Sequence, residues 1–190
     1  MGRWEPNARE RLELAALELF RERGYDGTTV AEIAERAGLT KRSFFRHFAD
    51  KRELLFSGQE QLTRLIADTI AGAPASATPL EAITAALMAL DPVFDDERRP
   101  LARERQAIIV DNLELREREL LKSTVLTTAM ADALRERGDS EPVANLAAEF
   151  GGLALHIAFT RWIEPDARQD YAKLAQQAVD ELRATAAELG

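Results

Sequence analysis

The sequence contains no cysteine, so disulfide bonds and thiolate metal ligands are excluded. Only two of its 190 residues are histidines, which gives a zinc site little support. A chain without cysteine fits the reducing cytoplasm, where we expect this protein to act. We expect it to need no metal and no other cofactor.

Residues that interrupt helices are scarce as well, with 10 glycines and 7 prolines. Alanine, leucine, glutamate and arginine dominate instead, and this balance predicts an all-α fold. No uncharged apolar run reaches the roughly 18 residues of a membrane span, so we expect no membrane partner. Residues 1–6 include no apolar stretch, so we also expect no signal peptide.

Positive charge is in deficit overall, and a net charge of −8 at pH 7 by itself speaks against a nucleic-acid partner. The distribution of the charge leads to the opposite conclusion. Residues 1–56 carry 11 Lys/Arg and 10 Asp/Glu, whereas residues 57–190 carry 14 and 23. Between Lys41 and Arg52 five cations accompany one anion, Asp50. Because DNA responds to the local field, this cluster is consistent with nucleic-acid binding.

Apolar spacing, caps and breakers predict about nine helices. Capping boxes of the Ser/Thr/Asp-x-x-Glu kind begin at Thr29 and Asp50, and Thr40 caps the helix between them. A linker of small residues and prolines occupies residues 73–79. The expected helices span residues 7–23, 29–37, 40–47, 51–72, 80–90, 101–111, 112–137, 142–162 and 166–189.

The second and third of these helices are joined by only two residues, Gly38 and Leu39. Such a tight turn lets one helix brace another that projects from the surface, as in a helix-turn-helix. In that motif the first residues of the second helix meet base edges in the major groove. The residues in that position here are polar or basic: Thr40, Lys41, Arg42 and Ser43.

Further residues around this turn complete a pattern of glycines, small residues and aromatics. They are Gly24-Tyr25-Asp26-Gly27-Thr28-Thr29-Val30, Ile33-Ala34, Ala37-Gly38-Leu39-Thr40, Phe45-Arg46-His47-Phe48 and Lys51. In order and spacing they resemble the DNA-binding domain of the tetracycline-repressor (TetR/AcrR) family, over about residues 9–56. The resemblance implies a homodimeric transcription regulator, usually a repressor, that binds double-stranded operator DNA and a small-molecule effector.

The resemblance also implies which residues contact DNA. Thr28 or Thr29 would contact a phosphate at the start of the second helix, and Thr40 would cap the third helix and touch phosphate. The others would face the groove or reach the backbone beyond it: Lys41, Arg42, Ser43 and Arg46 for the groove, His47 and Lys51 for the backbone.

Two positions depart from the family pattern. Phe45 stands where the family usually has tyrosine, so a hydrogen bond to phosphate is missing. Arg42 stands where a small residue is common, and it adds a long bidentate donor suited to guanine. The operator sequence therefore cannot be taken from a relative.

We predict two domains, a helix-turn-helix domain at residues 1–56 and a ligand-binding and dimerisation domain at residues 57–190. Helix 142–162 is apolar nearly all round and the last helix carries a regular apolar stripe, so both need cover on several faces. A two-fold four-helix interface supplies it, as the resemblance also implies; a monomer core is the alternative. The expected interface residues are small or apolar: Ala148, Gly151, Gly152, Leu155, Phe159, Leu174, Ala178 and Leu182.

A ligand pocket is expected among the helices of residues 79–137, although plain core is the commoner role of periodic apolar residues. The candidate lining residues are Leu87, Met88, Phe94, Ile108, Ile109, Leu120, Leu121, Thr124, Thr128 and Met130. His156 has apolar sequence neighbours and is expected to be buried and held by a hydrogen bond.

Residues 112–118, Asn-Leu-Glu-Leu-Arg-Glu-Arg, are similar to an actinobacterial branch of the family that includes the mycofactocin-system regulator. That similarity implies an acyl-CoA-like effector, whose phosphates a group of arginines would hold. These are Arg98, Arg99, Arg103 and Arg105. Interleaved Glu97 and Glu104 favour the simpler interpretation, a solvated and salt-bridged helix face.

Two other functions stay open on the residues alone. A helical carrier of small molecules without a DNA role would show no salt-dependent DNA binding and would leave the basic third helix unused. An enzyme would need a nucleophile–base pair, a metal cluster or a glycine-rich phosphate loop, and none is present in the sequence. Both rank below a repressor that a small apolar or acyl-type molecule releases from a palindromic operator.

Overall fold

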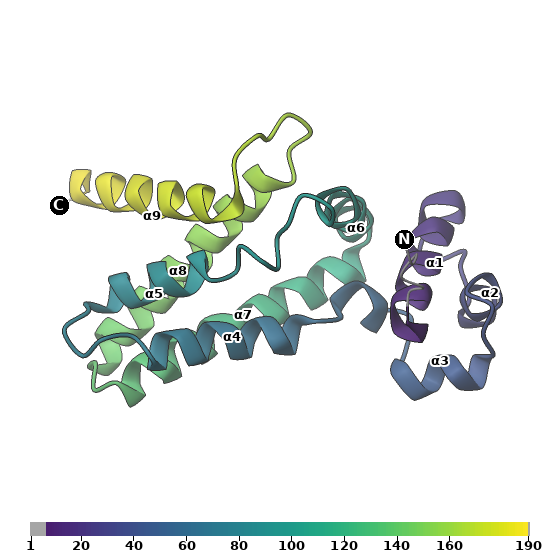
Figure 1. The fold of residues 1–190 in the computed structure, drawn as a ribbon, viewed down its shortest axis with the longest axis horizontal. Helices are drawn as coiled ribbons and strands as arrows, with labels where there is room; N and C mark the ends of the chain where they lie inside the picture. The colour runs from purple at the N-terminus through teal and green to yellow at the C-terminus, as the bar shows by residue number, and fades with distance from the viewer. Residues whose placement is uncertain (1–6, 190) are drawn as a thin grey trace, which may run out of the picture. The chain divides into compact units, whose positions relative to one another are not determined.

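The computed structural model describes residues 7–189, and every regular element within them is a helix (Figure 1). The all-α prediction with about nine helices is therefore confirmed. Residues 1–6, which bear on a signal peptide, lie outside the described part. The elements are α1 (Ala8–Arg23), α2 (Val30–Arg36), α3 (Lys41–His47), the 3-10 helix η1 (Glu53–Phe56), α4 (Gln59–Ala71), α5 (Pro79–Met88), α6 (Arg99–Asp111), α7 (Leu113–Glu136), α8 (Glu141–Trp162) and α9 (Tyr171–Glu188).

The chain divides into two compact units. The first, called the head below, combines the residues up to Ser57 with Leu101–Glu119. The second, called the body, comprises Gly58–Pro100 and the residues from Leu120 onward. The segment Leu101–Glu119, which holds most of α6 and the first turns of α7, was expected in the C-terminal domain. It packs instead with the N-terminal helices, so the head is larger than the helix-turn-helix alone.

The apolar stripes of the short helices converge in the core of the head. The apolar face of α1 is buried from Leu12 to Phe20. Ile109 of α6 and Leu115 of α7 belong to the same core, and both are fully buried. The other large contributors are Ile33, Phe44, Phe48, Leu54, Leu55 and Phe56. Because isolated helices as short as α2 and α3 are marginal in water, this shared core is what fixes them.

The fourth helix begins later than predicted. Asp50 accepts hydrogen bonds from the backbone N–H groups two and three residues ahead (2.9 and 3.2 Å), as a cap should, but the helix it starts is only η1. Ser57 is then extended, and Gly58 takes a left-handed φ of 81°. These two residues interrupt the helix, so α4 starts at Gln59.

Helices α5, α8 and α9 contact one another and form the core of the body. Small residues of α8 allow close approach. A Cβ atom at Gly151 would lie 2.7 Å from Cγ2 of Ile83 on α5, and one at Gly152 would lie 2.5 Å from Cγ2 of Thr127 on α7. By length and composition α8 also passes for a membrane span, a test that the core helix of a soluble protein can pass as well. Its contacts with α5 and α9 account for only part of its apolar character, because large apolar residues on its outer side stay exposed.

These contacts change the role of half of the residues predicted for a dimer interface. Four of them are buried within a single chain, where they pack the body and are not exposed to a second copy: Ala148, Gly151, Leu174 and Ala178. The remaining four are half-buried: Gly152, Leu155, Phe159 and Leu182. The small residues thus serve close packing inside the chain first.

The outer side of α8 instead carries large apolar residues that the prediction left out. Leu146 is 74% exposed and Leu153 is 49% exposed. His156 follows Leu153 by three residues, a spacing that keeps both on one side of the helix. The prediction that His156 is buried was wrong, because its apolar sequence neighbours Leu155 and Ile157 point to other sides of α8 and leave the imidazole exposed.

Candidate nucleic-acid interface

Threonine caps start the two helices of the helix-turn-helix. Thr29 accepts the backbone N–H of Glu32 (3.3 Å), and the Glu32 carboxylate accepts the backbone N–H of Thr29 (2.8 Å), which completes the predicted capping box. Thr40 accepts the backbone N–H of Ser43 (3.1 Å) at the start of α3. Both predicted caps are confirmed, and a cap of this kind stabilises a helix by about 1 kcal/mol.

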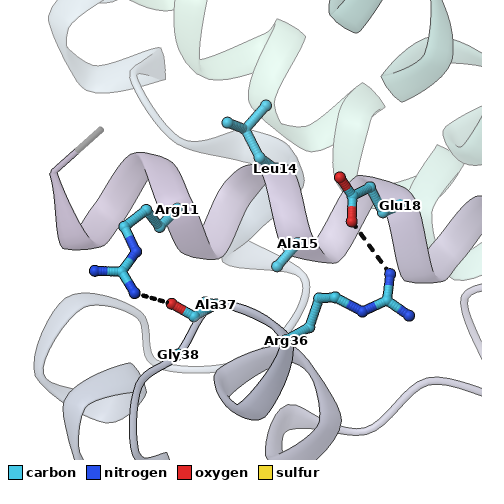
Figure 2. A pocket seen from close by; sticks show the side chains of 7 residues that line it. All are labelled: Arg11, Leu14, Ala15, Glu18, Arg36, Ala37 and Gly38. Carbon is cyan, nitrogen blue, oxygen red and sulfur yellow. Dashed lines mark hydrogen bonds and ion pairs between the residues drawn. The ribbon is translucent and has the colours of Figure 1, made fainter. Parts of the chain in front are cut away.

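The turn between α2 and α3 is braced by α1. Gly38 has a left-handed φ of 67°, and the Arg11 guanidinium, which donates to the carbonyl of Ala37, lies close to it. Figure 2 shows this bond at one end of a shallow hollow and the Arg36–Glu18 pair (3.1 Å) at the other. The hollow, of about 330 Å³, is lined by Arg11, Leu14, Ala15, Glu18, Arg36, Ala37 and Gly38. Because its polar groups bond to one another, the hollow holds α1 against the end of α2 and the turn that follows.

Helix α3 has one apolar face and one basic face. Phe44 and Phe48 are buried in the core of the head, with ring centroids 5.6 Å apart. The exposed side of the helix carries four side chains, of which Arg42 and Arg46 lie roughly opposite the buried face and the other two lie at its flank: Lys41, Arg42, Phe45 and Arg46. Within residues 7–189 none of its three cations forms an ion pair. Of the four residues predicted to face the groove, Lys41, Arg42 and Arg46 are therefore exposed together. Ser43 is half-buried.

Thr28 does not have the role that the resemblance implied. It is 1% exposed, and its hydroxyl donates to the carbonyl of Gly24 (2.9 Å), with the carbonyl of Leu19 also in reach (3.3 Å). A hydroxyl so placed ties the end of α1 to the start of α2 and cannot reach a phosphate. Thr29 is exposed, so of the two threonines it is the one whose side chain reaches the surface, although its hydroxyl already donates to the Glu32 carboxylate (2.7 Å).

Lys51 also turns inward. Its ammonium donates to the backbone carbonyls of Tyr25 (2.7 Å) and Thr28 (3.0 Å) and lies 4.2 Å from the centre of the Tyr25 ring. Burial, together with the nearby Glu114 carboxylate, raises the pKa of Tyr25 to about 12, so the phenol is neutral at pH 7. The predicted contact of Lys51 with the DNA backbone is corrected: Lys51 holds the α1–α2 loop.

His47 lies at the end of α3 and is half-buried. Its Nε2 atom is inaccessible and has no hydrogen-bond partner among the described residues. This nitrogen is therefore not presented to a phosphate as the resemblance implied. The exposed side of α3 therefore consists of the basic face and of Thr40, which caps the N-terminus of the helix.

Sequence reasoning missed the residues of α6 and α7 that hold η1 to the head. Arg118 bonds to the Glu53 carboxylate, and the Arg105 side chain donates to the Leu55 carbonyl while its guanidinium lies 5.3 Å from the Phe56 ring centre. Burial lowers the pKa of Arg105, partly offset by Glu119. Nothing in the sequence marks these arginines apart from others nearby, because their partners are 50 or 65 residues away.

An ion pair between Asp50 and Arg52 lies at the start of η1, where Asp50 caps the helix. Burial raises the pKa of Asp50, but hydrogen bonds and charge from Arg52 outweigh it, so the net effect is a lowered pKa. Arg52 donates to Asp50 at 2.5 Å and, through its other terminal nitrogen, to Glu114 at 2.7 Å. This cation of the basic cluster is therefore engaged within the head.

The four arginines considered for CoA phosphates have partners inside the protein. Arg98 pairs with Asp95 (3.3 Å), and Arg99 pairs with Asp96 and donates to the Ala167 carbonyl (2.7 Å). Arg105 is bound as described, and Arg103 also has an interaction partner. The simpler interpretation, a salt-bridged face, describes these contacts better than a phosphate site does.

The candidate pocket residues are not gathered in one cavity. Some are buried core (Leu87, Ile109, Met130), some are half-buried (Phe94, Ile108), and the rest are exposed (Met88, Leu120, Leu121, Thr124, Thr128). Ile108 and Ile109 belong to the head, whereas the others belong to the body. Thr124 and Thr128 do line a hollow of about 130 Å³ between α7 and α8, along with Thr127, Ala131, Arg135, Asn145, Ala148 and Glu149.

An aromatic cluster in the body was not foreseen as a unit. The Phe94 ring centre lies 4.3 Å from that of Tyr171, 5.2 Å from that of Trp162 and 5.7 Å from that of Phe159. Trp162 and Tyr171 are fully buried, and neither the indole N–H nor the phenol has a hydrogen-bond partner among the described residues. Burial raises the pKa of Tyr171. The Arg99 guanidinium lies 5.5 Å from the Trp162 ring centre.

Known proteins share parts of this sequence. Residues 14–57 match the family described as bacterial regulatory proteins, tetR family. The HTH-type transcriptional regulator TcmR of Streptomyces glaucescens is 38% identical over 82 residues, which make up 43% of this chain and 36% of that protein. The HTH-type transcriptional repressor KstR2 of Mycobacterium tuberculosis is 29% identical over 126 residues, 58% of this chain and 60% of that protein. The matches thus span less than two thirds of these relatives.

A solved structure covers more of the chain. The complex of SmeT with triclosan superposes with a TM-score of 0.65 at 22% identity, over 95% of this chain and 91% of that one. SmeT is the repressor of a multidrug efflux pump of Stenotrophomonas maltophilia. At this identity the likeness shows the fold, an N-terminal helix-turn-helix followed by a helical domain. The similarity of residues 112–118 to the mycofactocin-system branch stays a prediction.

Proposed function

We propose that this chain, whose residues 14–57 match the TetR family of bacterial regulatory proteins, is a member of that family and a homodimeric, ligand-responsive repressor. It binds a palindromic operator through α3 and releases it when a small apolar or acyl-type effector binds. It acts in the cytoplasm, where operator DNA is found. The observation that carries the proposal is the exposed face of α3, on which Lys41, Arg42 and Arg46 have no ion-pair partner among the described residues.

The geometry of that face suits the major groove. Thr40 caps the N-terminus of α3, and the buried side chains of Phe44 and Phe48 anchor the helix to the core of the head. The cations extend from its exposed side. Arginine can donate two parallel hydrogen bonds to guanine, and lysine can bind guanine or phosphate. The acidic remainder of the chain is repelled by DNA, so the duplex is directed to this one basic surface.

A second copy is needed to read a palindrome. Two recognition helices of a dimer sit in successive major grooves, so the operator is an inverted repeat whose half-site spacing the dimer sets. The exposed apolar residues of α8, Leu146 and Leu153, join the half-buried members of the predicted interface as candidates for the contact. In the proposed dimer contact, this surface takes the place of the predicted small residues, which are already packed within one chain.

The effector belongs to the body. By analogy, SmeT shares the fold and is solved with triclosan bound. The hollow between α7 and α8, about 130 Å³, is smaller than the roughly 300–1,000 Å³ of a pocket for a drug-sized ligand, so binding has to open the body. The unpartnered Trp162 and Tyr171 donors offer hydrogen bonds to a ligand that enters their cluster. Near-complete release needs an effector that prefers the released state by about 5.5 kcal/mol.

The test is an operator selection with the purified full chain. A random-sequence duplex library is incubated with the protein at about 150 mM salt, where non-specific binding is weak, and the bound fraction is sequenced. An enriched inverted repeat supports the proposal and supplies the probe for effector screening. If no sequence is enriched, and no salt-dependent DNA binding is found at about 50 mM salt either, a helical ligand-binding protein without a DNA role replaces it.

A further inference from the structure

One exposed residue of the basic face has no charge and no hydrogen-bonding group. Phe45 is 51% exposed on α3, about 40° around the helix from Lys41 and about 60° from Arg42. It therefore lies near the middle of the face that is proposed to enter the major groove. A single exposed apolar residue is ordinary on a protein surface, but here it occupies the place where base edges are read.

The ring is held where it is by two neighbours. It meets the buried Phe44 edge to face, with centroids 5.4 Å apart at 80°, and the Lys41 ammonium lies 5.9 Å from its centre. The core below α3 is already filled by Phe44 and Phe48, so the ring of Phe45 cannot turn inward. Its exposed part is therefore presented on the outer side of α3, where it can contact an apolar group by shape.

The chemistry of the groove offers such a ring few partners. Phenylalanine cannot donate to a phosphate, and an apolar ring placed against phosphate would only remove its water. The base edges of the major groove carry one apolar group, the C5-methyl of thymine, and phenylalanine is among the side chains that contact it. The 5-methyl group of methylated cytosine presents the same shape at the same position of the pyrimidine ring.

We propose that Phe45 reads the 5-methyl group of a pyrimidine in each half-site and so specifies thymine there. This inference rests on the proposed function, because it requires that α3 enters the major groove. It adds a residue that recognises a base of the operator without forming a hydrogen bond. It also makes a methylated cytosine at that position a partner of the same kind as thymine.

The test uses the full chain and the duplex obtained by operator selection. Each thymine of the half-site is replaced in turn by uracil, which lacks only the methyl group, and affinity is measured by fluorescence anisotropy. We expect one position, or two adjacent ones, where wild-type affinity falls about fourfold, the factor expected for burial of one methyl-sized group. Placing 5-methylcytosine opposite guanine there should give tighter binding than cytosine by a similar factor, which separates recognition of the methyl group from recognition of the other groups of thymine.

Two variants assign the effect to the ring. Phe45→Ala should bind the operator more weakly and should no longer distinguish thymine from uracil at that position, while Phe45→Leu should keep part of the distinction. Lys41→Ala is the matched control, since it should lose affinity but still distinguish the two bases. Lys41→Ala and Phe45→Leu should leave thermal unfolding almost unchanged, while Phe45→Ala, which loses the contact with Phe44, should lower the free energy of unfolding by about 1 kcal/mol at most.

Two results overturn the inference while the proposed function stands. One is a wild-type protein that binds every uracil duplex as tightly as the thymine duplex. The other is a Phe45→Ala variant that keeps the full thymine preference, because another residue then contacts the methyl. A protein that selects no operator at all refutes the proposed function, and this inference with it.

Discussion

The cations of α3 and the cations around them differ in whether the protein supplies their partners. Arg42 and Arg46 project from the head without a carboxylate within ion-pair distance among the described residues. Lys51 and Arg52, only a few residues further on, are bound to two backbone carbonyls and to two carboxylates respectively. One short basic cluster in the sequence therefore contains two kinds of residue, of which only the first is available to DNA.

This difference shows why a count of positive charges overstates a DNA-binding surface. A guanidinium that already forms an ion pair contributes little to the field outside the protein, and its donors are occupied. A guanidinium without a partner keeps both its charge and its hydrogen-bonding geometry for an external acceptor. The comparison can be tested by removing members of each group and measuring DNA affinity and stability separately.

The largest effect is expected for the double variant Arg42→Ala/Arg46→Ala. A direct base contact of arginine contributes roughly 1–3 kcal/mol, so operator affinity should fall about a hundredfold or more, measured by fluorescence anisotropy at about 150 mM salt. The free energy of unfolding should change by less than about 0.5 kcal/mol, because neither side chain is packed. Arg64→Ala, which removes an exposed arginine of α4, is the matched control and should leave affinity almost unchanged.

If affinity for random duplexes falls as much as affinity for the operator, both arginines bind phosphate and do not read bases. In that outcome the salt dependence of binding should also weaken, by about one unit of slope for each phosphate that the variant no longer neutralises. A double variant with unchanged affinity would remove the main support for α3 as the recognition helix.

The next largest effect is a loss of stability for Lys51→Met. Methionine keeps most of the side-chain volume but removes the donor of the Thr28 carbonyl and leaves the Tyr25 carbonyl only the backbone N–H of Thr28 (3.3 Å), so the free energy of unfolding should fall by about 2 kcal/mol in urea denaturation. Lys41→Met is the control, and it should weaken operator binding with little effect on unfolding. The opposite result for Lys51, unchanged stability with a weaker salt dependence of binding, would restore the phosphate contact that the family resemblance implied.

A smaller effect on stability, dependent on pH, is expected when the ion pair between Asp50 and Arg52 is removed. The pKa of Asp50 is lowered in the folded protein, so the unfolded chain binds the proton more tightly. The stabilisation from this pair is therefore present above the unfolded pKa of about 3.9 and is lost as the pH falls through the folded value. Asp50→Asn should be less stable than wild type at pH 6–7, with the difference shrinking below about pH 4. A difference that does not depend on pH would show that the amide disturbs the cap itself.

The sequence was sufficient for the parts of the fold that depend on local patterns. Caps at Thr29 and Thr40, the stripe of α1 and the two-residue turn at Gly38 each involve residues within a few positions of one another, and all are present in the structure. The outward residues of α3 followed from the family resemblance and from the place of the first residues in a helix-turn-helix, and Ser43, one of those predicted, is half-buried. Local patterning, together with the resemblance, therefore predicted the helix-turn-helix and its exposed cations.

What the sequence could not provide depends on distant partners. Lys51 looks like any exposed lysine until the carbonyls of Tyr25 and Thr28, 26 and 23 residues away, are brought to it. His156 has apolar neighbours along the chain, yet it lies on the exposed side of α8. The segment of residues 101–119 has ordinary amphipathic patterning that does not say which unit it packs against, so its packing with the head could not be inferred from hydrophobicity alone.

The contrast between partnered and unpartnered groups extends to buried hydroxyls, where the smallest effect is expected. Tyr171→Phe removes a phenol that has no hydrogen-bond partner among the described residues, so the free energy of unfolding should stay the same or rise by at most about 1 kcal/mol. Thr28→Val removes a buried hydroxyl that donates to the Gly24 carbonyl, and it should cost about 1–2 kcal/mol. Opposite signs in urea denaturation of the two variants would establish that the Tyr171 phenol, unlike the Thr28 hydroxyl, is an unused buried donor. A loss for Tyr171→Phe as large as that for Thr28→Val would instead place an ordered water or another acceptor beside the phenol, and the aromatic cluster would then have no free hydroxyl to offer an effector.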